Sequence, residues 1–285
     1  MSASSASTSD LSWRLLLDPP AAGAWNMAVD EVLLDGVAAG AAPPTLRFYA
    51  WAPACLSLGY FQPFDVVDVG GCRRLGVDVV RRPTGGRAIL HDRELTYSVA
   101  LPLRLLGNDG AVLPSYHRLS VALERGLKRL GVPVVLAPET GARPPVDHGP
   151  VCFDRPSAHE ILLGGRKLVG SAQVRRATAF LQHGSILIEP RIDRLLACLR
   201  LPDPGPGRIE DGVAGLAEAG DFEPSAVAGR LADAFAAEFG ARLTPGSLNP
   251  DEWRAAETLV TSKYQRVAWT EGHAPILAGN TTRTR

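Results

Sequence analysis

The stretch from Glu160 to Glu189 constrains the fold more than any other part of this sequence. EILL and RKLVG are two β-rich runs separated only by Gly164-Gly165. Two glycines in a two-residue loop supply the positive φ angles of a tight hairpin turn. FLQHGSILIE follows as a further β-rich run. The middle of the chain is therefore expected to form a β-sheet.

Other β-rich runs come earlier in the chain. WRLLLD (Trp13–Asp18) predicts a short buried strand that stops at Pro19-Pro20, while TLRFYAW and CLSLGY predict two strands that pair with each other. VDVVRR (Val77–Arg82) predicts a strand that enters a glycine turn, after which AIL and LTYSVAL resume extended structure. The β-rich half is expected to end near Glu189.

Helical spacing predicts the remaining elements. Asn26 is the expected N-cap of a helix that ends near Gly40, and Ser115 is the expected cap of a helix with Leu119, Leu123, Leu127 and Leu130 on one stripe. After Arg191 three more helices are expected: RIDRLLACLRL, then PSAVAGRLADAFAAEFG with Val227, Leu231, Phe235 and Phe239 on one face, then PDEWRAAETLV after the cap Asn249. The fold class is α+β, a mixed sheet with flanking helices and a helical C-terminal extension.

One domain of residues 11–270 is expected, with a β-rich core to about 190, a helical part over 191–270, and tails at 1–10 and 271–285. The tail MSASSASTSD has neither the basic residue nor the apolar core of a secretory signal, and no apolar run approaches the roughly 18 residues of a membrane span. Lys and Arg total 30 against 30 Asp and Glu, which argues against a nucleic-acid partner. The four cysteines form no C-x-x-C pair, so neither zinc nor a disulfide framework is expected and a cytoplasmic location is favoured.

The run RRPTGGRAILHD (Arg81–Asp92) is the first candidate for chemistry. Paired glycines let backbone N–H groups approach a ligand closely, and Arg81, Arg82 and Arg87 can neutralise an anion such as phosphate. The Gly-Lys-Ser/Thr ending of a Walker phosphate loop is absent. From the residues alone, a plain hairpin is the commoner interpretation of such a turn.

Cys152 is the second candidate. It follows Pro138–Pro150, a Pro- and Gly-rich stretch that predicts a long loop, and a loop cysteine beside a cation is more reactive than one in a core strand. Cys55 and Cys198 fall within apolar periodicity and are expected to be buried. Cys72, beside Arg73 and Arg74, is a candidate for exposure.

Lys167 is the third candidate, because a lysine at the start of a strand that leaves a tight turn can reach a nearby loop. A solvated hairpin lysine is the commoner interpretation of that pattern. His91 and His183 fall beside motif residues. The remaining histidines lack the spacing of metal ligands, so no metal site is expected: His117, His148, His159 and His273.

The order of these runs resembles the biotin/lipoate protein ligase superfamily. The matching runs are NMAVDEVLL, LSLGYFQ, RRPTGGRAILHD, GRKLVGSAQ, LQHGSIL and KYQRVAW, and the resemblance covers roughly Ala24 to Trp269. It implies the mixed sheet with flanking helices of the biotin/lipoate protein ligase catalytic domain. Two details look like its octanoyltransferase branch: Arg87 stands where the ATP-using ligases usually carry a third glycine, and a cysteine stands in CFDRPS.

The resemblance implies an octanoyl-[acyl-carrier-protein]:protein N-octanoyltransferase of lipoate biosynthesis. Cys152 would take the octanoyl group as a thioester and pass it to a lysine of a lipoyl-domain protein, such as glycine cleavage H protein or a dehydrogenase acyltransferase subunit, with Lys167 beside the sulfur. No cofactor is expected, because aminolysis of a thioester is downhill without ATP. The substrate-binding candidates are Arg82, Thr84, Gly85, Gly86, Arg87, His91, Gly170, Ser171, Ala172 and His183.

Three alternatives remain open. An ATP-dependent lipoate-protein ligase would use Lys167 to hold the carbonyl of an adenylate, and Cys152 would be incidental. An octanoyl amidotransferase would take the acyl group from one lipoyl-domain protein to another. A non-catalytic lipoyl-domain-binding module is the third, because fold does not fix function. Retention of both Cys152 and Lys167 argues against the third.

Overall fold

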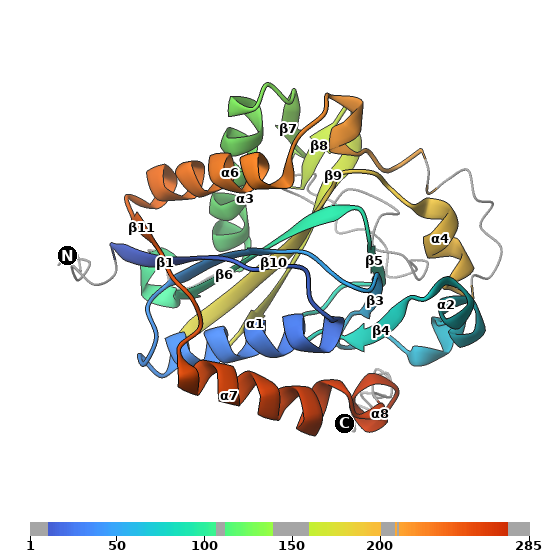
Figure 1. The fold of residues 1–285 in the computed structure, drawn as a ribbon. Coiled ribbons are helices and arrows are strands. Elements are labelled where there is room, and N and C mark those ends of the chain that lie inside the picture. Colours follow the sequence, from blue (N-terminus) through green and yellow to red (C-terminus); the bar gives the residue numbers. More distant parts are fainter. Residues whose placement is uncertain (1–10, 107–111, 139–159, 201–208, 210, 273–285) are drawn as a thin grey trace, which may run out of the picture.

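The computed structural model describes residues 11–106, 112–138, 160–200, 209 and 211–272 of the 285. Its main element is a mixed eight-stranded sheet with helices on both faces, as the sequence predicts (Figure 1). The strand order is β11-β1-β2-β6-β10-β9-β8-β7. In chain order these strands are β1 (Ser12–Leu17), β2 (Thr45–Tyr49), β6 (Glu94–Pro102), β7 (Val134–Leu136), β8 (Ile161–Leu163), β9 (Arg166–Arg175), β10 (Ala179–Leu187) and β11 (Arg242–Pro245).

β6 and β10 form the centre of this sheet. They run antiparallel over nine residue pairs, from Pro102 opposite Ala179 to Glu94 opposite Leu187, and every residue of both strands is buried. A strand covered on both faces needs side chains that pack or pair on both sides. The polar residues on these two strands therefore need partners inside the protein.

Two pairs of helices cover the two faces of the sheet (Figure 1). α3 (Val112–Arg129) and α6 (Pro224–Phe239) lie on one face, and α1 (Gly23–Ala38) and α7 (Pro250–Leu259) lie on the other. The predicted stripes face the core: Leu119, Leu123, Leu127, Val227, Leu231 and Phe235 are fully buried, and Leu130 and Phe239 are partly buried against them. No helix in the described part of the chain has the length and apolar character of a membrane span.

A separate three-stranded sheet stands beside the C-terminal end of β10, in the order β4 (Asp78–Arg81), β3 (Cys55–Leu58), β5 (Ile89–His91). The prediction that TLRFYAW and CLSLGY pair is wrong, because β2 and β3 belong to different sheets. β3 pairs in parallel with β4 and antiparallel with β5. The glycine turn thus crosses from one side of β3 to the other, and the plain-hairpin interpretation is also wrong.

Shorter helical segments complete the described fold. They are α2 (Val69–Leu75), α4 (Ile192–Ala197) and α8 (Val267–Thr270), the 3₁₀ turns Phe64–Val66, Leu103–Leu106 and Leu216–Glu218, and the π-helical turn Val260–Tyr264.

Two of the three predicted helix caps are wrong. α1 begins at Gly23, so Asn26 lies inside it and its side-chain amide donates instead to the carbonyls of Ala21 and Ala50. Ser115 likewise lies inside α3, where its hydroxyl donates to the carbonyl of Val112. Asn249 is the N-cap of α7 as predicted, because its side chain accepts from two backbone N–H groups of the first turn.

The hairpin prediction is confirmed, with φ of +56° at Gly164 and +78° at Gly165 joining β8 to β9. β11 was not predicted. It has only four residues, too few for an alternating pattern to be recognised in the sequence, and it pairs in parallel with β1. The segment after Arg191 therefore also contributes a strand to the main sheet.

Candidate functional site

A small pocket lies where the three-stranded sheet meets the central strands of the main sheet. Its apolar wall comes from Met27, Tyr49, Trp51 and Ile89. Its other lining residues are Ser57, Arg82, His91, Thr96, Gly170, Ala172, His183, Gly184 and Ser185. Five of the predicted substrate-binding residues therefore meet here: Arg82, His91, Gly170, Ala172 and His183.

The loop that carries the paired glycines is shaped around the side chain of Arg82. This guanidinium is 2% exposed and donates to the carbonyls of Gly85 (2.9 Å), Arg87 (2.7 Å) and Ser57 (2.9 Å). A methyl group on Gly59 would lie 1.8 Å from the carbonyl oxygen of Gly86, so the two loops are in close contact. The glycine loop is thus fixed by hydrogen bonds from Arg82 and by its close contact with Gly59.

Arg81 is also a structural residue. Its fully buried side chain donates to the carbonyls of Gly59 (2.7 Å), Gln62 (2.6 Å) and Thr270 (2.8 Å), and burial lowers its pKa. The expectation that Arg81 and Arg82 neutralise a bound anion is therefore wrong, because their donors bind groups of the protein itself: main-chain carbonyls for both and, for Arg82, also Ser57 Oγ. Arg87 is partly exposed.

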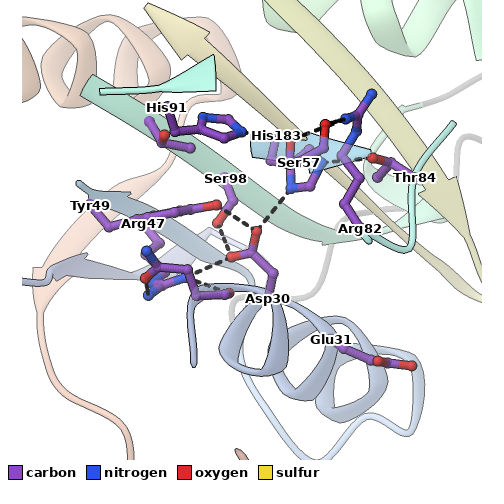
Figure 2. Close-up of polar contacts among 12 residues, drawn as sticks. Asp30, Glu31, Arg47, Tyr49, Ser57, Arg82, Thr84, His91, Ser98 and His183 are labelled. Carbon is purple, nitrogen blue, oxygen red and sulfur yellow. Dashed lines mark hydrogen bonds and ion pairs between the residues drawn. The ribbon is translucent and has the colours of Figure 1, made fainter. Parts of the chain in front are cut away.

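Asp30 on α1 is the centre of a buried polar cluster (Figure 2). Its carboxylate accepts hydrogen bonds from Arg47 Nη1 (2.8 Å), Ser98 Oγ (2.8 Å), Tyr49 Oη (2.9 Å) and His183 Nδ1 (3.0 Å). The other nitrogen of His183, Nε2, lies 2.7 Å from Thr84 Oγ1 on the glycine loop. A chain of hydrogen bonds thus ties this loop to α1.

The protonation of this chain follows from its surroundings. Burial opposes the charge on Asp30, but the hydrogen bond from His183 and the charge of Arg47 outweigh it and lower the pKa of Asp30. Burial, together with the nearby charge of Arg82, lowers the pKa of His183 although Asp30 acts to raise it. His183 is therefore neutral near pH 7, with its Nδ1–H donating to Asp30 and its Nε2 accepting from Thr84.

A second chain runs through His91 on β5. Its Nε2 lies 2.7 Å from Ser57 Oγ and its Nδ1 lies 2.9 Å from Glu94 Oε1. The ring stacks on Trp51, with 3.9 Å between ring centroids. Arg82 Nη1 donates to Ser57 Oγ at 3.1 Å. Two hydroxyl–imidazole–carboxylate chains therefore meet at one pocket.

Lys167 is buried, with 1% of its surface exposed, and its Nζ donates to Glu160 Oε1 at 2.6 Å. Its backbone is also fixed, because its N–H donates to Gly212 and its carbonyl accepts from Ala214. The solvated hairpin interpretation of Lys167 is therefore wrong.

A β-bulge determines where Lys167 points. Val169 lies opposite Ile161, but Lys167 lies opposite Leu162, so Leu168 is an extra residue on β9. A bulge changes the alternation of side chains across a strand. Lys167 therefore lies on the same face as Gly170 and Ala172, which line the pocket, instead of the face beneath α3.

Ser171 faces away from the pocket. Its hydroxyl lies 2.7 Å from that of Tyr97, which belongs to the core beneath α3 and α6. The side chain of Ser171 therefore does not contribute to the lining of the pocket.

The cysteines of the described residues are free and buried: Cys55, Cys72 and Cys198. Burial raises the pKa of Cys55 well above its ordinary value. Cys72 is 3% exposed and lies against Cys198, so its expected exposure is wrong, while burial of Cys55 and Cys198 is confirmed. Cys152 lies outside the described residues, as do His148, His159 and His273, and its placement beside Lys167 stays a prediction.

The sequence patterns did not predict the acidic residues and one hydroxyl of this site, which are Asp30, Glu94, Glu160 and Ser57. A usable signal was present for Asp30, which interrupts the apolar run NMAVDEVLL, whereas Glu94 stands at the start of the run ELTYSVAL. An acid in the buried stretch of a helix or strand needs a partner. In the described residues no three His, Cys, Asp or Glu side chains are grouped to hold a metal ion.

The mixed sheet, the smaller glycine-loop sheet beside it and the pocket where the two meet define the architecture as α+β, and comparison with known proteins gives the family. Residues 22–236 match the family described as the lipoyl protein ligase A/B catalytic domain. The chain belongs to this family.

Similar proteins cover almost the whole chain. A protein of Kyrpidia tusciae named octanoyltransferase LipM is 42% identical over 268 residues, which span 90% of this chain and 97% of the relative. The octanoyltransferase LipM of Symbiobacterium thermophilum is 42% identical over 91% of this chain and 98% of its own. A lipoate-protein ligase A solved with ATP superposes with a TM-score of 0.78 at 25% identity, covering 92% of this chain and 100% of the other. A T. acidophilum protein solved with lipoic acid gives 0.77 at 25% identity, covering 92% and 99%.

Proposed function

We propose that this protein is an octanoyltransferase of lipoate biosynthesis, which moves an octanoyl group from acyl carrier protein to a lysine of a lipoyl-domain protein. The observation that carries the proposal is the pocket. It has an apolar wall of Met27, Tyr49, Trp51 and Ile89, and the buried ammonium of Lys167 lies on the same sheet face. Burial of an acyl chain gains about 0.8 kcal/mol per methylene. Relatives named octanoyltransferase over almost the full length support the same activity.

In the proposed mechanism Cys152 attacks the donor thioester and holds the octanoyl group as a new thioester. The charge of Lys167 stabilises the thiolate and the oxyanion that develops on the carbonyl. The glycine loop and the main chain of Gly170–Ala172 shape the site around the acyl group. An acceptor lysine, such as that of glycine cleavage H protein, then takes the octanoyl group as an amide.

The test of the nucleophile uses the donor alone. After incubation with octanoyl-acyl carrier protein, intact mass should show one octanoyl group on the wild type and none on Cys152→Ala. Cys55→Ala and Cys198→Ala are the matched controls, because both thiols are fully buried. They should keep acylation and lose only packing stability, about 1–2 kcal/mol. Acylation that survives in Cys152→Ala would remove this residue from the mechanism.

A lipoate ligase is the second candidate, and the superposition on lipoate-protein ligase A with bound ATP is the observation that favours it. A ligase makes its own activated acyl group, so it requires nucleotide and free lipoate. The transferase does not, because the donor thioester already carries the activation. Dependence on ATP thus separates the two.

A further inference from the structure

We propose that Cys72 and Cys198 form a reversible disulfide bond, which a small oxidant such as hydrogen peroxide makes and a dithiol reductant removes. The two residues are 126 positions apart in the sequence, and they come together where α2 meets α4 (Figure 1). Neither Cys152 nor Lys167 takes part, so this chemistry is separate from octanoyl transfer.

The main chains of α2 and α4 are in direct contact beside the two cysteines. A methyl group on Gly71 would lie 1.8 Å from the carbonyl oxygen of Ala197. Gly71 and Ala197 are the chain neighbours of Cys72 and Cys198, so this close approach brings the two cysteines together. A disulfide needs Cα atoms about 4.4–6.8 Å apart, which only segments in direct main-chain contact provide.

The two thiols also face each other. Cys72 Sγ lies 3.8 Å from the carbonyl oxygen of Cys198, and the Cys72 thiol is hydrogen-bonded to the Cys198 thiol. Both side chains belong to the hydrophobic cluster that joins α2 and α4 to the three-stranded sheet, with exposed fractions of 3% and 0%. Cys55 belongs to a different cluster and packs against Gly23 at the start of α1.

Contacts on either side of the cysteines hold this arrangement. The N–H of Asp68, the N-cap of α2, donates to the carbonyl of Cys198 at 2.9 Å. Arg194 of α4 donates to the carbonyl of Leu75, the last residue of α2, at 3.0 Å. Because the two helices are already joined before and after Cys72, formation of the disulfide needs little rearrangement.

Cys198 is the sulfur that attacks the oxidant. Its pKa is lowered by the hydrogen bond from the Cys72 thiol and by the charge of Arg194, although burial acts in the opposite direction. The same hydrogen bond raises the pKa of Cys72, so Cys72 keeps its proton. A thiolate with a second thiol in contact proceeds to a disulfide, because the second thiol condenses with the sulfenic acid that forms first.

The oxidation takes place in two balanced steps. The Cys198 sulfur bonds to one oxygen of hydrogen peroxide, the O–O bond breaks, and the hydroxide released takes up the proton that Cys198 lost. The Cys72 sulfur then bonds to the Cys198 sulfur, the S–O bond breaks, and the leaving hydroxide takes the Cys72 proton. The two sulfurs lose two electrons in total, and the peroxide gains them as it becomes two water molecules.

Peptide mapping of the full chain tests the pairing. The protein is treated with stoichiometric hydrogen peroxide, free thiols are alkylated in denaturant, and the chain is cut before aspartate without reductant. Cys72 and Cys198 then lie in separate peptides, residues 68–77 and 193–202, which contain no other cysteine. The major cross-linked product should have the summed mass of these two peptides less two hydrogen atoms, and dithiothreitol should release both.

Three variants accompany the mapping. Cys55→Ala is the matched control, because Cys55 is also fully buried, and it should form the same cross-link. Cys72→Ser and Cys198→Ser should each lose the cross-link.

Thermal unfolding gives a second measurement. Oxidised and reduced protein are compared in Cys152→Ala, so that oxidation of Cys152 does not contribute. A disulfide that closes so long a loop should raise the melting temperature by about 5–10 °C.

Three results would overturn the proposal. The first is a major cross-link from Cys72 or Cys198 to Cys55 or Cys152. The second is peroxide treatment that leaves both thiols free, or oxidises them to sulfinic acids without joining them. The third is a lower melting temperature of the oxidised protein, which would show that α2 and α4 must be distorted to form the bond.

Discussion

Lys167 forms a buried ion pair with Glu160, whose Oε1 lies 2.6 Å from its Nζ. If charge is its contribution, Lys167→Arg should retain part of the octanoyl transfer and Lys167→Ala little, because Arg keeps the charge but does not release a proton at ordinary pH. Single-turnover transfer rates measure this, with folding of both variants checked by thermal unfolding.

If Lys167→Arg is as inactive as Lys167→Ala while both fold normally, Lys167 acts as the proton acceptor in octanoyl transfer. Full activity in both variants would remove Lys167 from the site.

The lowered pKa of His183 makes the free energy of unfolding depend on pH. Its pKa in the folded protein lies below the ordinary 6.5, so the unfolded chain binds the proton more readily. The contribution of His183 to the free energy of unfolding therefore rises with pH and reaches its full value above about pH 6.5. It falls as the pH drops toward the folded pKa, by at most about 1.4 kcal/mol per pH unit. In His183→Gln the urea midpoint should depend less on pH between 7.5 and 5.5 than in wild type or in His117→Gln. An unchanged dependence would contradict the assignment of His183 as neutral.

The contact between the loop after β3 and the glycine loop can be tested by adding a single methyl group to Gly59. Gly59→Ala would place a methyl group 1.8 Å from the Gly86 carbonyl oxygen, so one of the two loops must move. We expect a loss of about 1–3 kcal/mol in unfolding free energy and a larger fractional loss in octanoyl transfer than in stability. Denaturant unfolding and a transfer assay on the same sample measure both.

The matched control for Gly59→Ala is Gly229→Ala on α6, where an added methyl group meets nothing within 4 Å. Alanine is the better helix former, so this variant should be as stable as wild type or more stable by up to about 1 kcal/mol. If Gly59→Ala behaves like Gly229→Ala, the close approach of the two loops is not needed for activity.

Elements with local signals could be predicted from the sequence, and elements set by distant contacts could not. The Gly164-Gly165 hairpin and the Asn249 cap depend on neighbouring residues alone. β11 and the pairing of β3 depend on partners far along the chain. The site shows the same division. Lys167, His91 and His183 could be selected because they lie in or beside sequence motifs. The carboxylate of Asp30, which orients His183, lies 153 residues away in the sequence, and the bulge that turns Lys167 depends on the pairing register of β8 and β9.

The C-terminal segment contacts both α1 and the three-stranded sheet, which lie on either side of the pocket. Lys263 Nζ and Tyr264 Oη donate to Glu31, the neighbour of Asp30 on α1, at 2.7 and 2.6 Å. The carbonyl of Thr270 accepts from Arg81, which also holds the loop after β3. The run KYQRVAW therefore joins α1 to the three-stranded sheet by hydrogen bonds. This role gives a structural reason for its resemblance to the family's C-terminal motif.

In the proposed mechanism the donor thioester supplies all the activation for octanoyl transfer. The most direct measurement is to incubate the protein with octanoyl-acyl carrier protein and apo H protein, with nucleotide removed and divalent metal chelated, and to follow both proteins by intact mass. H protein should gain one octanoyl group at a wild-type rate that ATP does not change. Absence of transfer under these conditions, together with lipoylation of H protein from free lipoate and ATP, would contradict the account and identify a ligase.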